Sequence, residues 1–269
     1  MRVMSLNTVR GAAAWMAVAG LVWVLRPAYA DDAAAQGRQV VAKWKDAVVT
    51  ARLVIKMTMS GGPAGGGQPE ESKNDANGTV IDPSGLTVVS LSVVDPGEMY
   101  KRMAGAVGEK QQFNIETQLT DVKLRFADGT EVPAKVVLRD RDLDLAFIRP
   151  ADKLAQPAAA LDLSQAAPAQ LLDPVVTLNR LGNAGNWEIA PRIDRIQAIL
   201  TKPRTVYVPQ GGDEVGTPAF TLEGKVVGIT VVRMPVGSPG ARGDEESAGM
   251  AVILPAADLL EVAKQAPAQ

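Results

Sequence analysis

The segment GTVIDPSGLTVVS, residues 78–90, places two runs rich in β-branched residues on either side of the turn sequence DPSG at residues 82–85. Proline is favoured at the second position of a β-turn and glycine at the last, and β-branched residues favour strands. The segment therefore predicts a β-hairpin, and similar segments follow it along the chain.

A second hairpin is predicted downstream. Residues 121–126 alternate polar and apolar side chains, turn at Asp128 and Gly129, and return as residues 132–138. Pro255 before an apolar stretch predicts a short closing helix. Further strands are predicted at residues 47–55, 143–148, 175–178, 193–200, 205–208, 219–221, 225–232 and 250–254.

The strands fall into two groups. Residues 151–170, between the groups, are rich in Ala, Pro and Gln and show little periodicity, which predicts a linker. The domain boundaries that follow are an N-terminal β unit at 31–150, a C-terminal β unit at 171–254, and a helix with a tail at 255–269. Many short strands with regular turns predict an all-β protein of two sandwiches or barrels.

Two stretches do not follow the strand pattern. Residues 31–45 predict a helical or irregular segment that is amphipathic around Val40 and Trp44. The glycine-rich run at 61–67, with the polar residues that continue through Asp75, predicts a surface loop. No Gly-Lys-Ser/Thr follows this run, which argues against a phosphate-binding loop.

The composition excludes several classes of function. The 269-residue chain contains no cysteine and no histidine. It therefore has no disulfide, no thiolate, no imidazole ligand for a metal and no Ser-His-Asp triad. With 28 Lys and Arg against 30 Asp and Glu, the net charge is −2. This balance offers no surplus of cations for phosphates, so nucleic acid is not an expected partner.

Residues 1–30 have the composition of a secretory signal peptide. Residues 1–10 contain Arg2 and Arg10 and no acidic residue, and an apolar run follows at 11–25. The small residues Ala28 and Ala30 then predict cleavage after Ala30. The alternative is a membrane anchor, but this apolar run is shorter than the ~20 residues that a spanning helix needs. We expect export to the periplasm or the extracellular space, with no membrane span after cleavage.

No metal or other cofactor is expected. The segment DRDLD at 140–144 opens like a calcium-binding loop, but Leu145 and Ala151 stand where that motif requires Gly and Glu. Gly182 and Gly185 do not form the G-x-G-x-x-G pattern of a dinucleotide site.

Several segments, taken in order, resemble one family, the trypsin-like serine proteases of the bacterial HtrA/Deg type. The resemblance covers nearly the whole chain after residue 40 and implies two β-barrels packed together with a groove at their interface, closed by a short C-terminal helix. The chain ends where such proteases begin a PDZ domain, so no PDZ domain is expected. The segments are GTVIDPSGLTVVSLSVVD (78–95), VPAKVV and DLDLAFI (132–148), LGN (181–183), DEVGTPAF and EGKVVGI (213–229), and GMAVILP (249–255).

The resemblance also implies that the catalytic machinery is degenerate. Carried over position by position, the family's catalytic histidine falls on Ser92, its aspartate on Asp144 and its nucleophilic serine on Val215, while Asp213 replaces a glycine of the oxyanion hole. Valine has no atom that attacks a carbonyl, and serine is no base at neutral pH. The resemblance thus implies a pseudoprotease. Asp144 could remain a functional acid, but an aspartate just before a buried strand often accepts main-chain N–H bonds, so we interpret it as structural and able to bond Ser92.

A protein of this kind acts by binding. In the resembled family an extended peptide can pair with a strand at the rim of the groove, and that strand corresponds here to Ile229, Thr230, Val231 and Val232. We therefore expect a peptide or an exported protein as the partner, and the oligomeric state stays open.

Two other functions remain as alternatives. One is a weak peptidase with a nonstandard site, in which Thr217 attacks with Glu214 as its nearest acid in the sequence. The other is a structural or assembly subunit.

Overall fold

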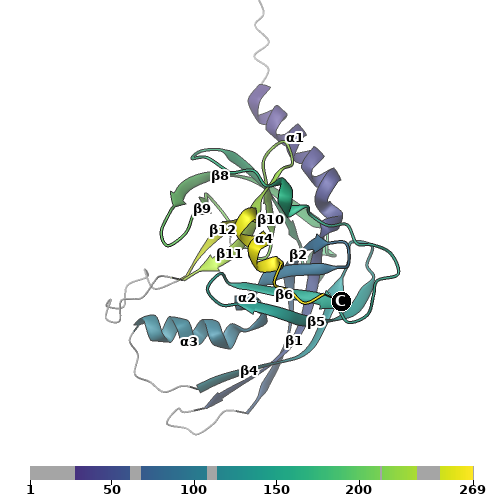
Figure 1. Cartoon of the computed structure of the whole chain (residues 1–269), viewed down its shortest axis with the longest axis vertical. Helices are drawn as coiled ribbons and strands as arrows, with labels where there is room; N and C mark the ends of the chain where they lie inside the picture. Colours follow the sequence, from purple (N-terminus) through teal and green to yellow (C-terminus); the bar gives the residue numbers. More distant parts are fainter. Residues whose placement is uncertain (1–27, 61–67, 108–113, 213, 235–248, 269) are drawn as a thin grey trace, which may run out of the picture.

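The structure, a computed structural model, describes residues 28–60, 68–107, 114–212, 214–234 and 249–268. Within these residues the strands form two closed antiparallel barrels that pack against each other, and a helix follows the last strand (Figure 1). The prediction of an all-β double barrel with a short C-terminal helix is confirmed.

The first barrel has the strand order β1-β2-β3-β6-β5-β4. Two helices interrupt it after β3: α2 (Leu91–Val94) and α3 (Pro96–Val107), the second of which lies along β4 in Figure 1. The strands are β1 (Val48–Ser60), β2 (Glu70–Asp82), β3 (Leu86–Ser90), β4 (Asn114–Arg125), β5 (Glu131–Asp140) and β6 (Leu145–Pro150).

The second barrel has the order β10-β11-β12-β9-β8-β7. Pro255 precedes α4 (Ala256–Ala263), as the sequence predicts. The strands are β7 (Pro174–Arg180), β8 (Ile189–Leu200), β9 (Val206–Pro209), β10 (Pro218–Phe220), β11 (Val226–Arg233) and β12 (Met250–Pro255). Single turns of 3-10 helix occur at η1 (Lys45–Ala47), η2 (Leu163–Gln165) and η3 (Asn183–Gly185).

The hairpin at residues 78–90 forms between β2 and β3. The Gly85 N–H donates to the Asp82 carbonyl at 2.9 Å, and the Ser84 N–H donates to the Asp82 carboxylate at 2.8 Å. Gly85 has φ +89°, a conformation that glycine adopts without the steric cost that a side chain would bring. The turn residues therefore direct the chain as the sequence predicts.

Two predictions need correction or refinement. The expected loop through Asp75 is wrong over residues 70–75, because β2 begins at Glu70 and pairs with β1 from Met57 backwards. Four of these six polar residues are exposed, while Ser72 and Asn74 are half-buried, and an antiparallel strand can be solvated on one face. The expected helical or irregular segment is α1 (Ala28–Trp44). Residues 61–67 lie outside the described residues.

The link between the barrels is anchored at both ends. Ala158 N–H donates to the Pro83 carbonyl and Leu161 N–H to the Val80 carbonyl, both at 2.9 Å, in the first barrel. Ala167 N–H then donates to the Val226 carbonyl of the second barrel at 2.8 Å. Residues 151–170 therefore hold a defined path between the two barrels.

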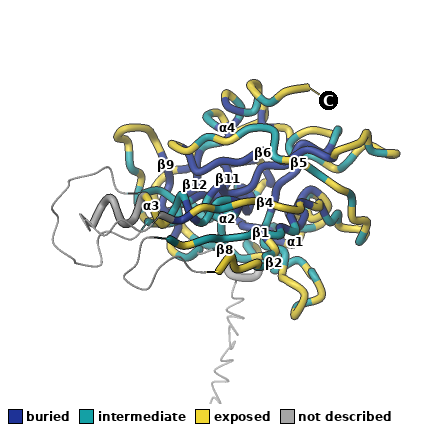
Figure 2. Tube along the Cα trace, turned by 90° about the horizontal axis from the view of Figure 1, so that it is seen from below, coloured by how far each residue is buried: buried dark blue, intermediate teal, exposed yellow. Residues whose placement is uncertain are grey.

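A continuous apolar core joins the barrels. Val88 and Phe147 from the first barrel belong to the same buried cluster as Phe220 and Ile229 from the second, and all four are fully buried. Figure 2 shows this buried layer in dark blue at the centre of the molecule. Trp44 of α1 stacks on Phe220 at 5.9 Å and donates its indole N–H to the Gly224 carbonyl at 2.9 Å, which fixes α1 to the second barrel.

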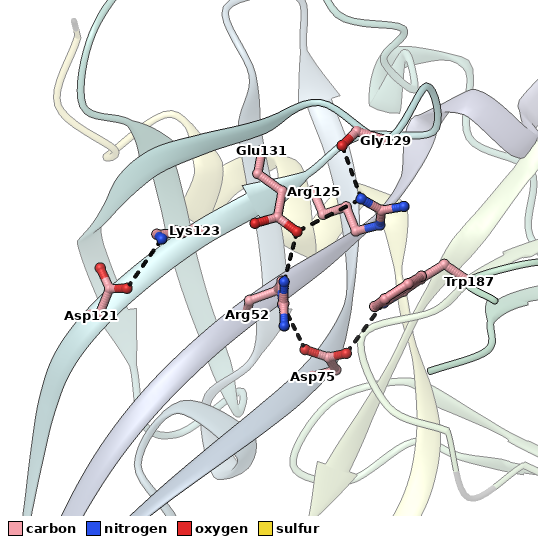
Figure 3. Close-up of polar contacts among 8 residues, drawn as sticks. All are labelled: Arg52, Asp75, Asp121, Lys123, Arg125, Gly129, Glu131 and Trp187. Carbon is pink, nitrogen blue, oxygen red and sulfur yellow. Dashed lines mark hydrogen bonds and ion pairs between the residues drawn. The ribbon is translucent and has the colours of Figure 1, made fainter. Parts of the chain in front are cut away.

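Trp187 of the second barrel reaches into a charged cluster on the first (Figure 3). Its indole N–H donates to Asp75 at 3.2 Å, and the Arg125 guanidinium lies 4.2 Å from its ring centroid. Arg52 bridges Asp75 at 3.3 Å and Glu131 at 2.7 Å. The ring thus joins the two barrels through cation–π and hydrogen-bond contacts.

Candidate functional site

Asp144 lies at the centre of the site, where a tight turn enters β6. It is 4% exposed and has φ +57°, an uncommon conformation for a residue with a side chain. Its own carbonyl accepts a hydrogen bond from Leu91 N–H at 2.9 Å, which fixes the start of α2 beside the carboxylate.

The Asp144 carboxylate is surrounded by donors from both barrels. Ser90 Oγ donates to Oδ2 at 2.5 Å, and the Ser92 N–H donates to Oδ1 at 2.7 Å. The Val232 N–H of β11 donates to Oδ2 at 2.8 Å. The expected bond between Asp144 and Ser92 is present, and the carboxylate also connects the two barrels.

Burial raises the pKa of the Asp144 carboxyl above its ordinary value, and the hydrogen bonds from Ser90, Val232 and Ser92 oppose that rise. The hydroxyls of Ser90 and Ser92 lie 2.6 Å apart. The group around the carboxylate therefore consists of hydroxyls and amides, none of which accepts a proton at neutral pH. Ser90 was not identified from the sequence, although its place two residues before Ser92 was a usable signal.

The Val215 position comes close to this cluster through its neighbour Gly216. Gly216 N–H donates to the Thr230 carbonyl at 2.7 Å, and the Thr79 hydroxyl donates to the Gly216 carbonyl at 3.0 Å. A Cβ on Gly216 would lie 2.2 Å from the Asn77 carbonyl oxygen and 3.6 Å from Ser90 N. The segment carrying Val215 is therefore packed against the strand that leads to Ser92.

An ion pair connects the loop before Val215 to β8. Arg192 of β8 bonds Asp194 at 2.6 Å and pairs with Glu214 at 3.2 Å. The predicted oxyanion-hole position, Asp213, lies outside the described residues. Glu214, the acid closest in sequence to Thr217, is thus already paired with an arginine.

Thr217 lies in a buried position, 2% exposed. Its hydroxyl donates to the Glu214 main-chain carbonyl at 2.8 Å and contacts the Thr230 hydroxyl at 3.2 Å. Within the described part of the chain no carboxylate bonds it. An attacking hydroxyl needs a base within hydrogen-bond reach, so these contacts favour a structural role.

The residues of the predicted peptide-binding strand, 229–232, differ in how many neighbouring strands they pair with. Ile229 pairs with Pro218 of β10 and with Leu254 of β12, so it lies between two strands. Thr230 is likewise bonded to the chain beside it, through Thr217 at 2.9 Å. A peptide finds no free strand edge at these two residues. Val231 and Val232 extend past β10, but both pair with β12, and the Val232 N–H is already bonded to Asp144.

Two cavities follow the seam between the barrels, and Val232 and Met234 line both. The small one, bounded by Ser92 and Asp144, encloses about 10 Å³, close to the space that one water molecule needs. The larger one, here named the seam pocket, encloses about 260 Å³. Its lining includes Leu143, Arg204, Val206, Val231, Arg233 and Val252.

A third cavity lies away from these residues. It encloses about 660 Å³ between the β4–β5 turn and residues 152–159, with Phe126, Asp128 and Leu154 on its walls. None of the site residues predicted from the sequence lines it.

Two further features bear on metal binding and on membrane contact. Among the residues described, no three or more Asp or Glu side chains gather as metal ligands do. No helix in the described ranges has the length and apolar character to cross a bilayer.

Comparison with known proteins places these features in context. Residues 76–229 match the sequence model of a family described as trypsin-like peptidase domain. Among solved structures, the apo protease domain of MamO from Magnetospirillum magneticum is similar in fold, with a TM-score of 0.50 and 16% sequence identity. The alignment covers 81% of this chain and 96% of that domain. No curated protein sequence gives a significant match.

Proposed function

Because this chain belongs to the trypsin-like peptidase family, we propose that it is an exported, catalytically inactive member of the HtrA/Deg type. Its function in this proposal is to bind an extended peptide, or an extended segment of an exported protein, in the seam between the barrels. Export rests on the composition of residues 1–30.

The observation that carries the proposal is the state of Asp144. In an active triad this carboxylate orients an imidazole and stabilises its charge. Here Ser90, Ser92 and Val232 occupy it, at 2.5, 2.7 and 2.8 Å. The chain contains no imidazole, and Val215 carries no nucleophilic atom. The chemistry that cuts a peptide bond therefore has neither its base nor its nucleophile.

The weak-peptidase alternative has less support. It requires Thr217 to be activated by a nearby acid, but the Thr217 hydroxyl bonds a main-chain carbonyl and Glu214 pairs with Arg192. Removing the nucleophile or the base of an intact triad lowers kcat by about 10⁶. A site that lacks both is not expected to turn over a substrate at a measurable rate.

Binding is supported by the shape of the seam. The seam pocket is lined by Val231 and Val232, where β11 extends past β10, and by the apolar side chains of Val206 and Val252. Concave sites with apolar floors and a few polar groups are the usual places for ligands. The peptide would lie against Val231 and Val232, beyond the end of β10, because Ile229 and Thr230 are enclosed by neighbouring strands. Since the Val232 N–H is bonded to Asp144, the contact there would be through side chains.

The test uses the chain without residues 1–30. A fluorescein-labelled library of capped random hexapeptides is titrated with the protein, and fluorescein-casein turnover is followed in parallel. We expect saturable peptide binding and no casein turnover above buffer. Val232→Trp should weaken binding at least about tenfold by filling the seam, whereas Leu171→Trp, at a leucine that is 56% exposed and outside the pocket lining, should not.

The outcome separates the three functions. Binding without turnover supports the proposal, and turnover that Thr217→Ala abolishes supports the peptidase. A protein that binds no library peptide, and whose size in solution changes when residues 31–45 are removed, is better described as an assembly subunit.

A further inference from the structure

The seam pocket carries more positive charge than a general peptide site needs. Arg204 is exposed and forms no ion pair with any described residue, and Arg233 stands beside it on the pocket wall. Of the described residues that line the pocket, Asp142 is the one with a carboxylate, and it too is exposed. Within the described lining there are thus two guanidinium groups and one carboxylate, in a protein whose overall charge is negative.

Arg233 is only partly satisfied by the protein. Its Nη2 donates to the Lys202 carbonyl, while Nη1 is buried and has no hydrogen-bond partner in the described part of the molecule. A buried guanidinium N–H without an acceptor is unfavourable, and native proteins seldom leave one unpaired. A carboxylate matches the fork of donors that a guanidinium offers.

The rest of the lining favours a side chain over a larger ligand. Val206, Val231 and Val252 form an apolar floor and are each at most 3% exposed. Charges interact more strongly beside such a floor than in open water. The volume of about 260 Å³ is below the roughly 300–1,000 Å³ of sites that hold small molecules.

Charge changes sign along the seam. The small cavity next to the seam pocket is lined by Asp95, Glu98 and Asp144, and of these Glu98 pairs with Arg141 at 3.8 Å. An acidic side chain is repelled at that end and attracted at the other. This difference in charge would orient an acidic peptide along the seam.

We propose that the seam pocket binds a glutamate or aspartate side chain of the peptide, with Arg204 and Arg233 as the groups that select it. This rests on the proposed function, because it assigns a sequence preference to the peptide bound in the seam. Apolar residues on either side of the acid would contact the floor of the pocket.

The test is a positional-scanning library of capped, fluorescein-labelled hexapeptides, with Glu or Gln fixed at each position in turn. At one position we expect the Glu pool to bind at least about tenfold more tightly than the Gln pool. Arg204→Gln should remove this preference, so that the Glu and Gln pools bind with similar affinity, and Arg204→Lys should keep part of it. Lys153→Gln, at an exposed lysine that lines the distant cavity, is the matched control.

Salt provides a second readout, since the preference for Glu should fall as ionic strength rises while binding of the Gln pool does not. Equal binding of Glu and Gln pools, or a preference that survives Arg204→Gln, overturns this inference and leaves the proposed function standing. Failure of every pool to bind contradicts both.

Discussion

Asp144 in the first barrel accepts a hydrogen bond of 2.8 Å from the main-chain N–H of Val232 in the second. The residue that a peptidase uses to orient its base is here a buried connection between the two halves of the molecule. Under the proposed function, this change of partners gives Asp144 a structural role in place of a catalytic one. It also makes the acid a determinant of stability.

The first prediction concerns the charge on Asp144. Asp144→Asn removes an acceptor shared by Ser90 and Val232 and should lower the free energy of unfolding at pH 7 by about 1–3 kcal/mol. Because the folded state raises the pKa of this carboxyl, ionisation costs stability, and the cost disappears as the group is protonated. The free energy of unfolding of wild type, relative to that of Asp144→Asn, should therefore increase as the pH falls from 7 towards 4.

Urea unfolding of both proteins at several pH values measures this difference. The comparison with the variant is needed because the pKa values of Asp82 and Asp128 are lowered in the folded protein. Those groups contribute stability at neutral pH that is lost on acidification. If the relative stability of wild type does not change with pH, or decreases as the pH falls, the pKa of Asp144 is not raised in the folded protein.

The second prediction concerns Gly216, which has φ +80°. A Cβ there would lie 2.2 Å from the Asn77 carbonyl oxygen, a backbone atom that cannot move away cheaply. Gly216→Ala should destabilise the protein by more than about 3 kcal/mol, through strain and overpacking together. Gly182→Ala is the matched control, because no described atom lies within 4 Å of a Cβ at that position. Thermal unfolding followed by circular dichroism compares the two, and equal melting temperatures would show that the barrels do not approach each other as described.

The third prediction concerns Trp187. Trp187→Ala removes the ring between the barrels and should lower the free energy of unfolding by about 1–3 kcal/mol, less than for a fully buried ring. Trp187→Phe keeps the face above Arg125 but loses the bond to Asp75, so it should lie between wild type and alanine. Urea titration gives the order, and a phenylalanine variant as unstable as alanine would argue against the cation–π contact.

The fold could be predicted because its turns depend on residues that are adjacent in the sequence. The turn from Asp82 to Gly85 closes a hairpin through its own hydrogen bond, and the runs of β-branched residues on either side form the two strands. The outer part of β2 was missed because its residues from Glu70 to Asp75 are polar on both faces, so periodicity gives no signal there. α3 was also missed. It packs against β4 through a hydrogen bond from the Gly97 N–H to the Thr117 hydroxyl, which joins residues that are distant in the sequence.

The site was only partly accessible from the sequence. Position-by-position resemblance identified Ser92 and Asp144, and the structure bonds them at 2.7 Å. The partner in the second barrel, Val232, is 88 residues away and bonds through its main chain, which no side-chain pattern can reveal. Arg204, just before β9, and Arg233, the last residue of β11, line one pocket only because the fold brings these two segments together.

The central claim is that the protein binds peptides without cutting them. Its most direct test is mass spectrometry of the hexapeptide library after prolonged incubation with the protein at equal molar amounts, with the bound and free fractions analysed separately. The account predicts a bound fraction enriched over the input in which every peptide is intact. New peptide termini that accumulate with time, and that no longer form with Thr217→Ala, would contradict it.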